Sequence, residues 1–243
     1  MIPTSPQHRT LAVIIGRAGS KGLPGKNARL LAGQPMICHA IEDALAAQHV
    51  DRVIVSTDGK AIADAAQSMG VQVVRRPPEL ASDTATVDSA VRHAVQAIDS
   101  DESIIVILYA NVPVRPDDLI DRAVAMLIET GADSVQSYSD VGKFHPHWMV
   151  TLDSDRRVKP HMANTVYRRQ DLPELLIPNG GVIAVTKQSL FHVIEGQPHA
   201  FLGTDRRGIV SPAGSVIDVD NQMDFVIAEA MLVAQRPSMQ IHV

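Results

Sequence analysis

The residues best suited to chemistry form a glycine-rich segment, residues 16–27, directly after an apolar run at 11–15. Three cations lie within it, Arg17, Lys21 and Lys26. Its four glycines allow the backbone to come close to a ligand, and clustered cations with free amides bind anions. The segment therefore predicts a polyphosphate site. A solvated basic loop is the alternative, and the position directly after a strand weighs against it.

A second candidate is the acidic pair Asp218 and Asp220 near the end of the chain. They alternate along a predicted edge strand, so both carboxylates would point to one face. Magnesium commonly uses one or two carboxylates together with phosphate oxygens. A solvated Asp-x-Asp on an exposed edge is the alternative. Asp224 falls within the next predicted helix and is set aside.

Short apolar runs alternate with helical patterns in the first half of the chain, which predicts a mostly parallel sheet with helices on both faces. The predicted strands are residues 11–15, 52–57, 71–74, 103–108, 134–137 and 177–185; the predicted helices are 35–47, 60–69, 86–98, 117–129 and 222–233. We expect one domain over 1–243, with a protruding excursion at 139–176 that serves as a lid or dimer contact. Ligands of such sheets bind beyond the carboxyl ends of the strands, which would bring the loops after residues 15, 57 and 108 together.

Composition narrows the class of protein. The chain has 243 residues, 45% hydrophobic and 20% charged, with a net charge of −5, so it lacks the basic footprint of nucleic-acid binding. Its single cysteine, Cys38, excludes an intrachain disulfide framework. No apolar run is typical of a signal peptide or membrane span, so we expect no membrane partner and a cytoplasmic location.

The glycine-rich segment fits neither the P-loop nor the dinucleotide fingerprint. It resembles instead the signature of the cytidylyltransferases that activate acidic sugars, most closely the acylneuraminate type. Five blocks carry the resemblance in order, at residues 17–27, 53–58, 76–84, 179–181 and 217–220. The resemblance implies a Rossmann-like nucleotidyltransferase fold.

The resemblance also implies roles for residues. Arg17 and Lys21 would contact the triphosphate of CTP, and Asp218 would activate the attacking hydroxyl directly or through a metal. Mg²⁺ would bind Asp218 and Asp220. The remaining nucleotide-binding residues would be Ser20, Lys26, Asn27, Arg76 and Ala85. The reaction would couple CMP to a 2-keto sugar acid and release pyrophosphate, in a homodimer.

The chain departs from that family after residue 108. Residues 109–115 are Tyr-Ala-Asn-Val-Pro-Val-Arg, where the family usually has Gln-Pro-Thr-Ser-Pro-Leu-Arg, a segment that borders the sugar. We therefore expect an altered acceptor side, whose residues would be Tyr109, Asn111, Arg115, Arg168 and Asn179. Arg169 is the alternative to Arg168. His145 and His147 flank a proline in the excursion, and a structural role is favoured for both.

The residues leave several functions open. The acceptor could be a sialic, pseudaminic or legionaminic type of nonulosonic acid, a phosphonate, or 3-deoxy-octulosonate, for which the segment after residue 108 is a poorer match. The chain could also be a sugar-phosphate nucleotidyltransferase that uses another base, or a catalytically silent nucleotide-binding homologue.

Overall fold

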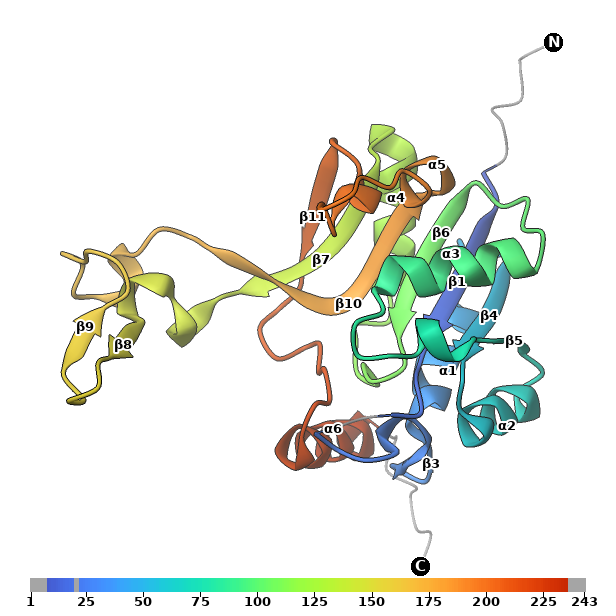
Figure 1. Ribbon diagram of the computed structural model, residues 1–243, viewed down its shortest axis with the longest axis horizontal. Helices are drawn as coiled ribbons and strands as arrows, with labels where there is room; N and C mark the ends of the chain where they lie inside the picture. Colours follow the sequence, from blue (N-terminus) through green and yellow to red (C-terminus); the bar gives the residue numbers. More distant parts are fainter. Residues whose placement is uncertain (1–7, 20–21, 236–243) are drawn as a thin grey trace, which may run out of the picture.

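The computed structural model describes residues 8–19 and 22–235 and contains a central seven-stranded sheet (Figure 1). The strand order is β11-β7-β10-β6-β1-β4-β5. These strands are β1 (Thr10–Ile15), β4 (Arg52–Thr57), β5 (Gln72–Arg75), β6 (Ile104–Tyr109), β7 (Ser134–Asp140), β10 (Leu176–Thr186) and β11 (Arg206–Val210). All neighbours pair in parallel except β10, which is antiparallel to both β6 and β7. The predicted mostly parallel α/β sheet is confirmed.

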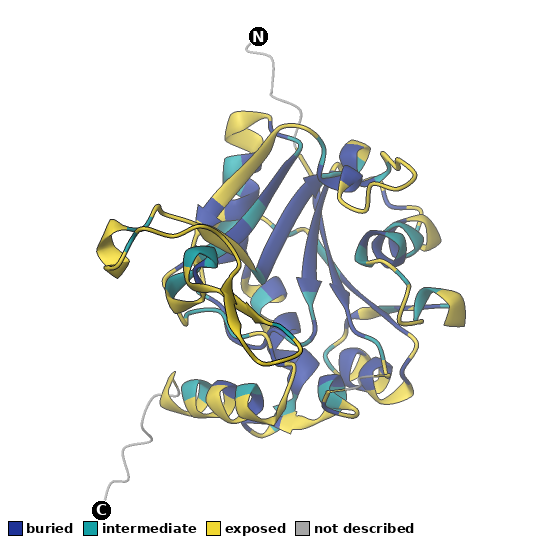
Figure 2. Ribbon diagram, turned by 60° about the vertical axis from the view of Figure 1, so that its left-hand side comes forward, coloured by how far each residue is buried: buried dark blue, intermediate teal, exposed yellow. Residues whose placement is uncertain are grey.

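Helices cover both faces of the sheet because its central strands are apolar on both sides. On one face, Ala12 and Ile14 belong to a core shared with α1 (Met36–Ala46), α2 (Lys60–Ser68) and α4 (Leu119–Thr130). On the other face, Leu11 and Val13 pack with α3 (Val87–Ala97), α5 (Lys187–Leu190) and the short helix η6 (Ala200–Leu202). A sheet buried on both faces needs strands without polar alternation, and β1 is buried along its whole length (Figure 2).

A third, smaller core lies at the carboxyl end of the parallel strands. It joins Leu23 of the glycine-rich segment to Val219 and to Phe225 of α6 (Gln222–Gln235). The short hairpin of β2 (Leu30–Leu31) and β3 (Gln34–Pro35) packs beside it. The helix α6 thus packs against the glycine-rich segment, which lies about 200 residues earlier in the chain.

The predicted excursion is an arm that projects from the sheet on the left of Figure 1. Strands β7 and β10 lead into it, and its outer part holds a hairpin of β8 (Val150–Leu152) and β9 (Val158–Pro160). Most of the arm is exposed (Figure 2). Its base is fixed by the buried His145, whose Nε2 lies 3.0 Å from the carbonyl oxygen of Pro173.

Two sets of elements differ from the prediction. Residues 217–220 are not an edge strand: only Ile217 forms a bridge, to Val114, and the acids follow in irregular backbone. Strand β11 and the hairpins β2–β3 and β8–β9 were not predicted. In the described part of the chain, no helix is both long enough and apolar enough to cross a membrane.

Candidate active site

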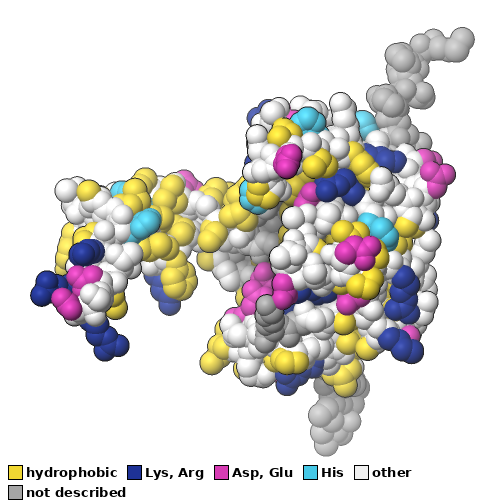
Figure 3. Space-filling view, in the orientation of Figure 1, with side chains coloured by type: hydrophobic (Ala, Val, Ile, Leu, Met, Phe, Trp, Pro, Cys, Tyr) yellow, Lys and Arg dark blue, Asp and Glu magenta, His cyan; other side chains and the backbone are white. Residues whose placement is uncertain are grey.

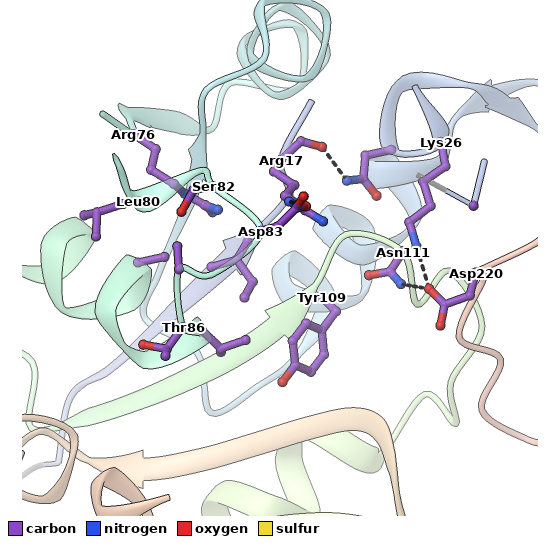
Figure 4. A pocket seen from close by; sticks show the side chains of 17 residues that line it. Arg17, Lys26, Arg76, Leu80, Ser82, Asp83, Thr86, Tyr109, Asn111 and Asp220 are labelled. Atoms are coloured by element: carbon purple, nitrogen blue, oxygen red, sulfur yellow. Dashed lines mark hydrogen bonds and ion pairs between the residues drawn. The ribbon is translucent and has the colours of Figure 1, made fainter. Parts of the chain in front are cut away.

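A cavity of about 470 Å³ lies beyond the carboxyl ends of β1 and β6. The glycine-rich loop, the loop after β5 and the loop after β6 surround it (Figure 4). Eight residues predicted for the site line this cavity, namely Arg17, Lys26, Asn27, Arg76, Ala85, Tyr109, Asn111 and Asp220. The predicted Ser20 and Lys21 lie outside the described residues.

Two glycines let the loop approach the rest of the site. A Cβ at Gly16 would lie 2.8 Å from the Cβ of Ala110, and a Cβ at Gly22 would collide with the carbonyl oxygen of Asp220. Contacts this short do not occur between real side chains and backbone, so both positions require glycine. The glycines therefore allow tight packing of the loop, besides any approach of a ligand.

Arg17 is held through both its side chain and its backbone. Its Nη1 lies 2.6 Å from Oδ1 of Asp83, and its carbonyl oxygen accepts a hydrogen bond from Asn27 Nδ2 at 3.0 Å. The next residue, Ala18, donates its backbone N–H to Asp58 at the end of β4. The guanidinium of Arg17 is thus paired with a carboxylate across the cavity, in the region where phosphates would lie.

Arg76 lies at the start of the loop after β5 and is largely buried. Its Nε donates to Ser56 Oγ at 3.2 Å and its Nη2 to the carbonyl oxygen of Ser56 at 2.7 Å. Burial lowers the pKa of Arg76 and the nearby Asp58 opposes that effect. Arginine stays charged in proteins, so this wall of the cavity carries a fixed cation.

The two acids lie around a shared amide. Nδ2 of Asn111 contacts Oδ1 of Asp218 and lies 3.5 Å from Oδ1 of Asp220. Lys26 Nζ donates to Asp220 Oδ1 and to the carbonyl oxygen of Val219, each at 2.7 Å. One cation and one amide therefore hold Asp220 at the cavity wall (Figure 4), and the same amide binds Asp218, which does not itself line the cavity.

Asp218 is the more perturbed acid. Its partial removal from water raises its pKa to about 6, and the charge of Asp220 adds to the rise. Lys26 and the Asn111 amide oppose it. Asp218 also raises the pKa of Tyr109, after burial, which is the larger cause. A carboxylate with a pKa near neutrality is suited to exchange a proton with a substrate.

Irregular backbone positions the acids in place of the predicted edge strand. The backbone N–H of Val219 donates to the carbonyl oxygen of Asn111 at 2.8 Å. Asp224 Oδ2 accepts the N–H groups of Asp220 and Asn221, at 2.9 and 3.1 Å. Asp224, for which no role was predicted, thus has a structural one: it fixes the backbone of Asp220 at the start of α6.

The residues that are present fit a divalent ion. Two close carboxylates repel each other when both are ionised, which after burial is the second cause of the raised pKa of Asp218, and a cation between them would relieve this repulsion. No group of three His, Cys, Asp or Glu residues suited to a metal occurs in the ranges 8–19 and 22–235. Bound phosphates would have to complete the shell, as is usual for magnesium.

Arg115 does not lie where the prediction placed it. Its side chain is 0% exposed and pairs with Asp43 of α1 at 2.6 Å. It also donates to the carbonyl oxygens of Val112 and Gly181, at 2.6 and 3.1 Å. Burial raises the pKa of Asp43 and lowers that of Arg115 in spite of their pairing. Arg115 therefore supports the loop after β6 from the interior of the protein. Its side chain is not accessible to a substrate.

Two further acceptor-side predictions, Asn179 and Arg168, lie outside the first cavity in a single chain. Asn179 uses its side chain within the sheet: Oδ1 accepts from Ser137 Oγ at 2.6 Å, and Nδ2 donates to Ser139 Oγ at 2.9 Å. Arg168 is exposed on the arm and pairs with Asp171 at 2.8 Å. Neither residue lines the cavity of 470 Å³.

A second cavity of about 380 Å³ adjoins the first. Both cavities include Thr86, Val87 and Tyr109 in their walls, so the Tyr109 ring lies at their boundary. Beyond it, Gln136 and Tyr138 from β7 and Arg206 from β11 line the second cavity. None of these three residues was predicted. Polar residues at alternate positions of an otherwise buried strand, 136 and 138, are the signal that could have found two of them.

Comparison with known proteins agrees with this geometry. The sequence profile described as cytidylyltransferase matches residues 11–177. The chain belongs to this cytidylyltransferase family. Among its relatives, CMP-N,N'-diacetyllegionaminic acid synthase of Legionella pneumophila is 34% identical over 230 residues, which cover 92% of this chain and 96% of the relative. N-acylneuraminate cytidylyltransferase of Streptococcus agalactiae is 32% identical over 222 residues. The match covers 90% of this chain but 52% of that relative, so the chain spans about half its length.

Two solved structures share the cytidylyltransferase fold. A CMP:2-keto-3-deoxy-manno-octonic acid synthetase complexed with CTP aligns with a TM-score of 0.73 at 17% identity, over 93% of this chain and 99% of the other. The 4-diphosphocytidyl-2C-methyl-D-erythritol synthase of Anaerococcus prevotii aligns with a TM-score of 0.64 at 13% identity, over 93% of this chain and 97% of the other. At such identities the likeness concerns the fold.

Proposed function

We propose that this chain transfers CMP from CTP to a 2-keto sugar acid of the nonulosonic type, with release of pyrophosphate. The observation that carries the proposal is the meeting of two cavities at Tyr109, beside Asp218 and Asp220. A cytidylyl transfer needs a nucleotide site and an acceptor site whose reacting ends touch. The names of the Legionella and Streptococcus relatives, and the CTP in the octonic acid synthetase, support the choice of substrates.

In this proposal the cavity of 470 Å³ takes CTP. Arg17 and Lys26 would face the triphosphate, whose negative charge they offset where water is partly excluded. The buried Arg76 and the loop that contains Ala85 would border the ribose and base. Lys21 and Ser20 keep the phosphate roles that the family resemblance gives them.

Asp218 would then take the proton of the anomeric hydroxyl as its oxygen attacks the α-phosphorus and pyrophosphate leaves. Its raised pKa matches this role. Asp218 and Asp220 would hold Mg²⁺, which supplies charge screening for the phosphates. Positioning the two substrates contributes most of the remaining acceleration.

Homodimer formation is part of the proposal. The arm exposes apolar side chains along its outer half, including Val150 (53% exposed), Leu152 (61%) and Val158 (63%). Contiguous exposed apolar surface of this kind is typical of a protein interface (Figure 3). A second copy of the arm would cover it, and the basic Arg168 could then reach the partner's acceptor site. A cytoplasmic location belongs to the same proposal, since CTP is a cytoplasmic nucleotide.

The test is an assay of pyrophosphate release with CTP, UTP, GTP or ATP, magnesium and a panel of 2-keto sugar acids. We expect release with CTP and at least one nonulosonic acid. Release with another nucleotide would favour a sugar-phosphate nucleotidyltransferase. Binding of CTP without release on any acid would favour a silent homologue. Asp64→Asn, on the exposed face of α2 and away from both cavities, is the matched control for Asp218→Asn.

A further inference from the structure

The second cavity has polar groups at the end remote from the site of reaction. The strand register gives the separation. Arg206 pairs with Ser134, Ser134 with Val185, and Val185 with Ile105, which precedes Tyr109 by four residues. Three strand spacings of about 4.8 Å and four residues of about 3.3 Å put the Cα atoms of Arg206 and Tyr109 roughly 20 Å apart. Arg206 therefore lies at the outer end of an elongated cavity.

The remote end is a set of hydrogen-bond donors. Arg206 is oriented by two backbone carbonyls: its Nε donates to Gly203 at 2.8 Å and its Nη2 to His199 at 2.9 Å. The Tyr138 hydroxyl donates to Oε1 of Gln136 at 3.1 Å, which leaves the Gln136 amide nitrogen as a donor. Guanidinium and amide N–H groups can be satisfied only by acceptors. Arg206 is exposed, so water satisfies its free N–H groups until a ligand with an acceptor oxygen replaces it.

The backbone beneath is shaped for these side chains. A Cβ at Gly208, next to Arg206 on the same face of β11, would lie 3.2 Å from the Tyr138 ring. Because Gly208 has no side chain, the Tyr138 ring can pack directly against the backbone of β11. The carbonyls of residues 199 and 203 come from either side of η6, so a short turn fixes the guanidinium.

The walls of the second cavity between Tyr109 and Arg206 indicate which chemical group would carry the acceptor oxygen. Ile183, Phe201 and Leu202 contribute apolar surface to the cavity. Asp88 also lines it and pairs with Arg92 at 2.5 Å. A neutral carbonyl with a small alkyl group fits these apolar walls and the donor end.

We infer that Arg206 is a specificity-determining residue that binds the carbonyl oxygen of an acylamido group on the sugar acid, far from the reacting carbon. This inference rests on the proposed function for the identity of the acceptor. It explains why the second cavity extends well past Tyr109. The residue acts on the acceptor alone, since it lines only the second cavity.

The experiment uses two 2-keto sugar acids that differ only at the tail, one with an acylamido group and one with a hydroxyl at the same carbon. Arg206→Gln should raise KM for the acylamido acid about tenfold to a hundredfold, the worth of a charged hydrogen bond. It should leave KM for the hydroxyl acid, KM for CTP and kcat within about twofold. Arg206→Lys should recover part of the loss because it restores a charged donor.

Arg207→Gln is the matched control. Arg207 is the next residue on β11, points to the other face of the strand and pairs with Asp205 at 2.8 Å. This variant should leave KM for both acids unchanged. If Arg206→Gln kept the wild-type preference while the wild type turned over both acids, the inference would be wrong and the proposed function would stand.

Calorimetric titration of the same acids onto the CTP-loaded protein tests the role of Arg206 separately from the proposed cytidylyl transfer. Binding without turnover, with a preference that Arg206→Gln abolishes, would support the inference and contradict the proposed function. Absence of binding by either acid to the wild type would overturn the inference.

Discussion

At the scale of single residues, the raised pKa of Asp218 suits its proposed role and lowers the stability of the fold at neutral pH. Asp218 is the proposed base, and its pKa is raised to about 6 by partial removal from water and by Asp220. In the unfolded chain its pKa would be near 3.8. The folded protein therefore binds this proton more tightly than the unfolded chain, so the stability of the folded state falls as pH rises from about 4 to about 6.

We predict that Asp218→Asn lowers activity at least about a hundredfold and slightly stabilises the fold at pH 7. Asp218 is exposed on its outer side, so solvent reduces the gain to roughly 2 °C in melting temperature. Thermal melts of wild type and variant at pH 4 and pH 7 check this. The gain should vanish at pH 4, and a gain independent of pH would contradict the assigned cause.

Arg115 was predicted to bind the acceptor because it is an arginine in a substrate-binding block, but its side chain is buried against Asp43. We predict that Arg115→Met destabilises the protein by about 3 to 5 kcal/mol, because it leaves Asp43 and two carbonyls without their partner. Chemical denaturation measures this loss. Arg122→Met, which removes an exposed partner of Asp118, should cost less than about 1 kcal/mol. Equal costs for the two variants would show that Arg115 is not a buried support of the loop.

At the scale of elements, the pair Arg17–Asp83 connects the glycine-rich loop to the loop before α3. A triphosphate would compete with Asp83 for the guanidinium. We predict that Asp83→Asn tightens CTP binding about two- to fivefold, the worth of a partly exposed ion pair, and that salt reduces the effect. Titration of CTP at two ionic strengths measures it. Weaker binding would mean instead that Asp83 orients Arg17 for the phosphates.

The elements also show which features the sequence could predict. The first cavity was predictable because its glycines and cations are contiguous and follow a strand, so most of the expected residues line it. Strand β11 could not be predicted, because its residues Arg-Arg-Gly-Ile-Val lack alternating apolar positions. It is a strand because it pairs with β7, which lies far away in the sequence. The second cavity depends on β11 and was missed with it.

The same reasoning applies to Arg115 and Asn179. Both belong to blocks that resemble a substrate-binding family, and a sequence does not reveal that a side chain points beneath a loop. Burial and partner choice decide their roles, and these depend on α1 and β7, far away in the chain. Asp224 is the opposite case: it was set aside as part of a predicted helix, and it fixes the backbone of Asp220 at the start of that helix.

At the scale of the whole molecule, the arm is the exposed part that a second copy would cover. We predict a dimer by light scattering for the wild type and a monomer for Leu152→Asp with Val158→Asp, because two buried charges cost more than the lost apolar contact. If the partner's arm reaches the acceptor site, the monomer should keep KM for CTP and show a higher KM for the acid. Exposed Asp64→Asn is the control, and a variant that stays dimeric would place the interface elsewhere.

Lys26 and the segment it holds are 193 and 194 residues apart in the chain. Synthesis proceeds from the N-terminus at about 5 to 20 residues per second, so roughly 10 to 40 seconds separate the arrival of the cation from that of the carboxylates. During that interval the growing chain has the positive half of its site without the acids. A chain that ends before Asp218 has the cations of the loop but no carboxylate at that position to receive the proton.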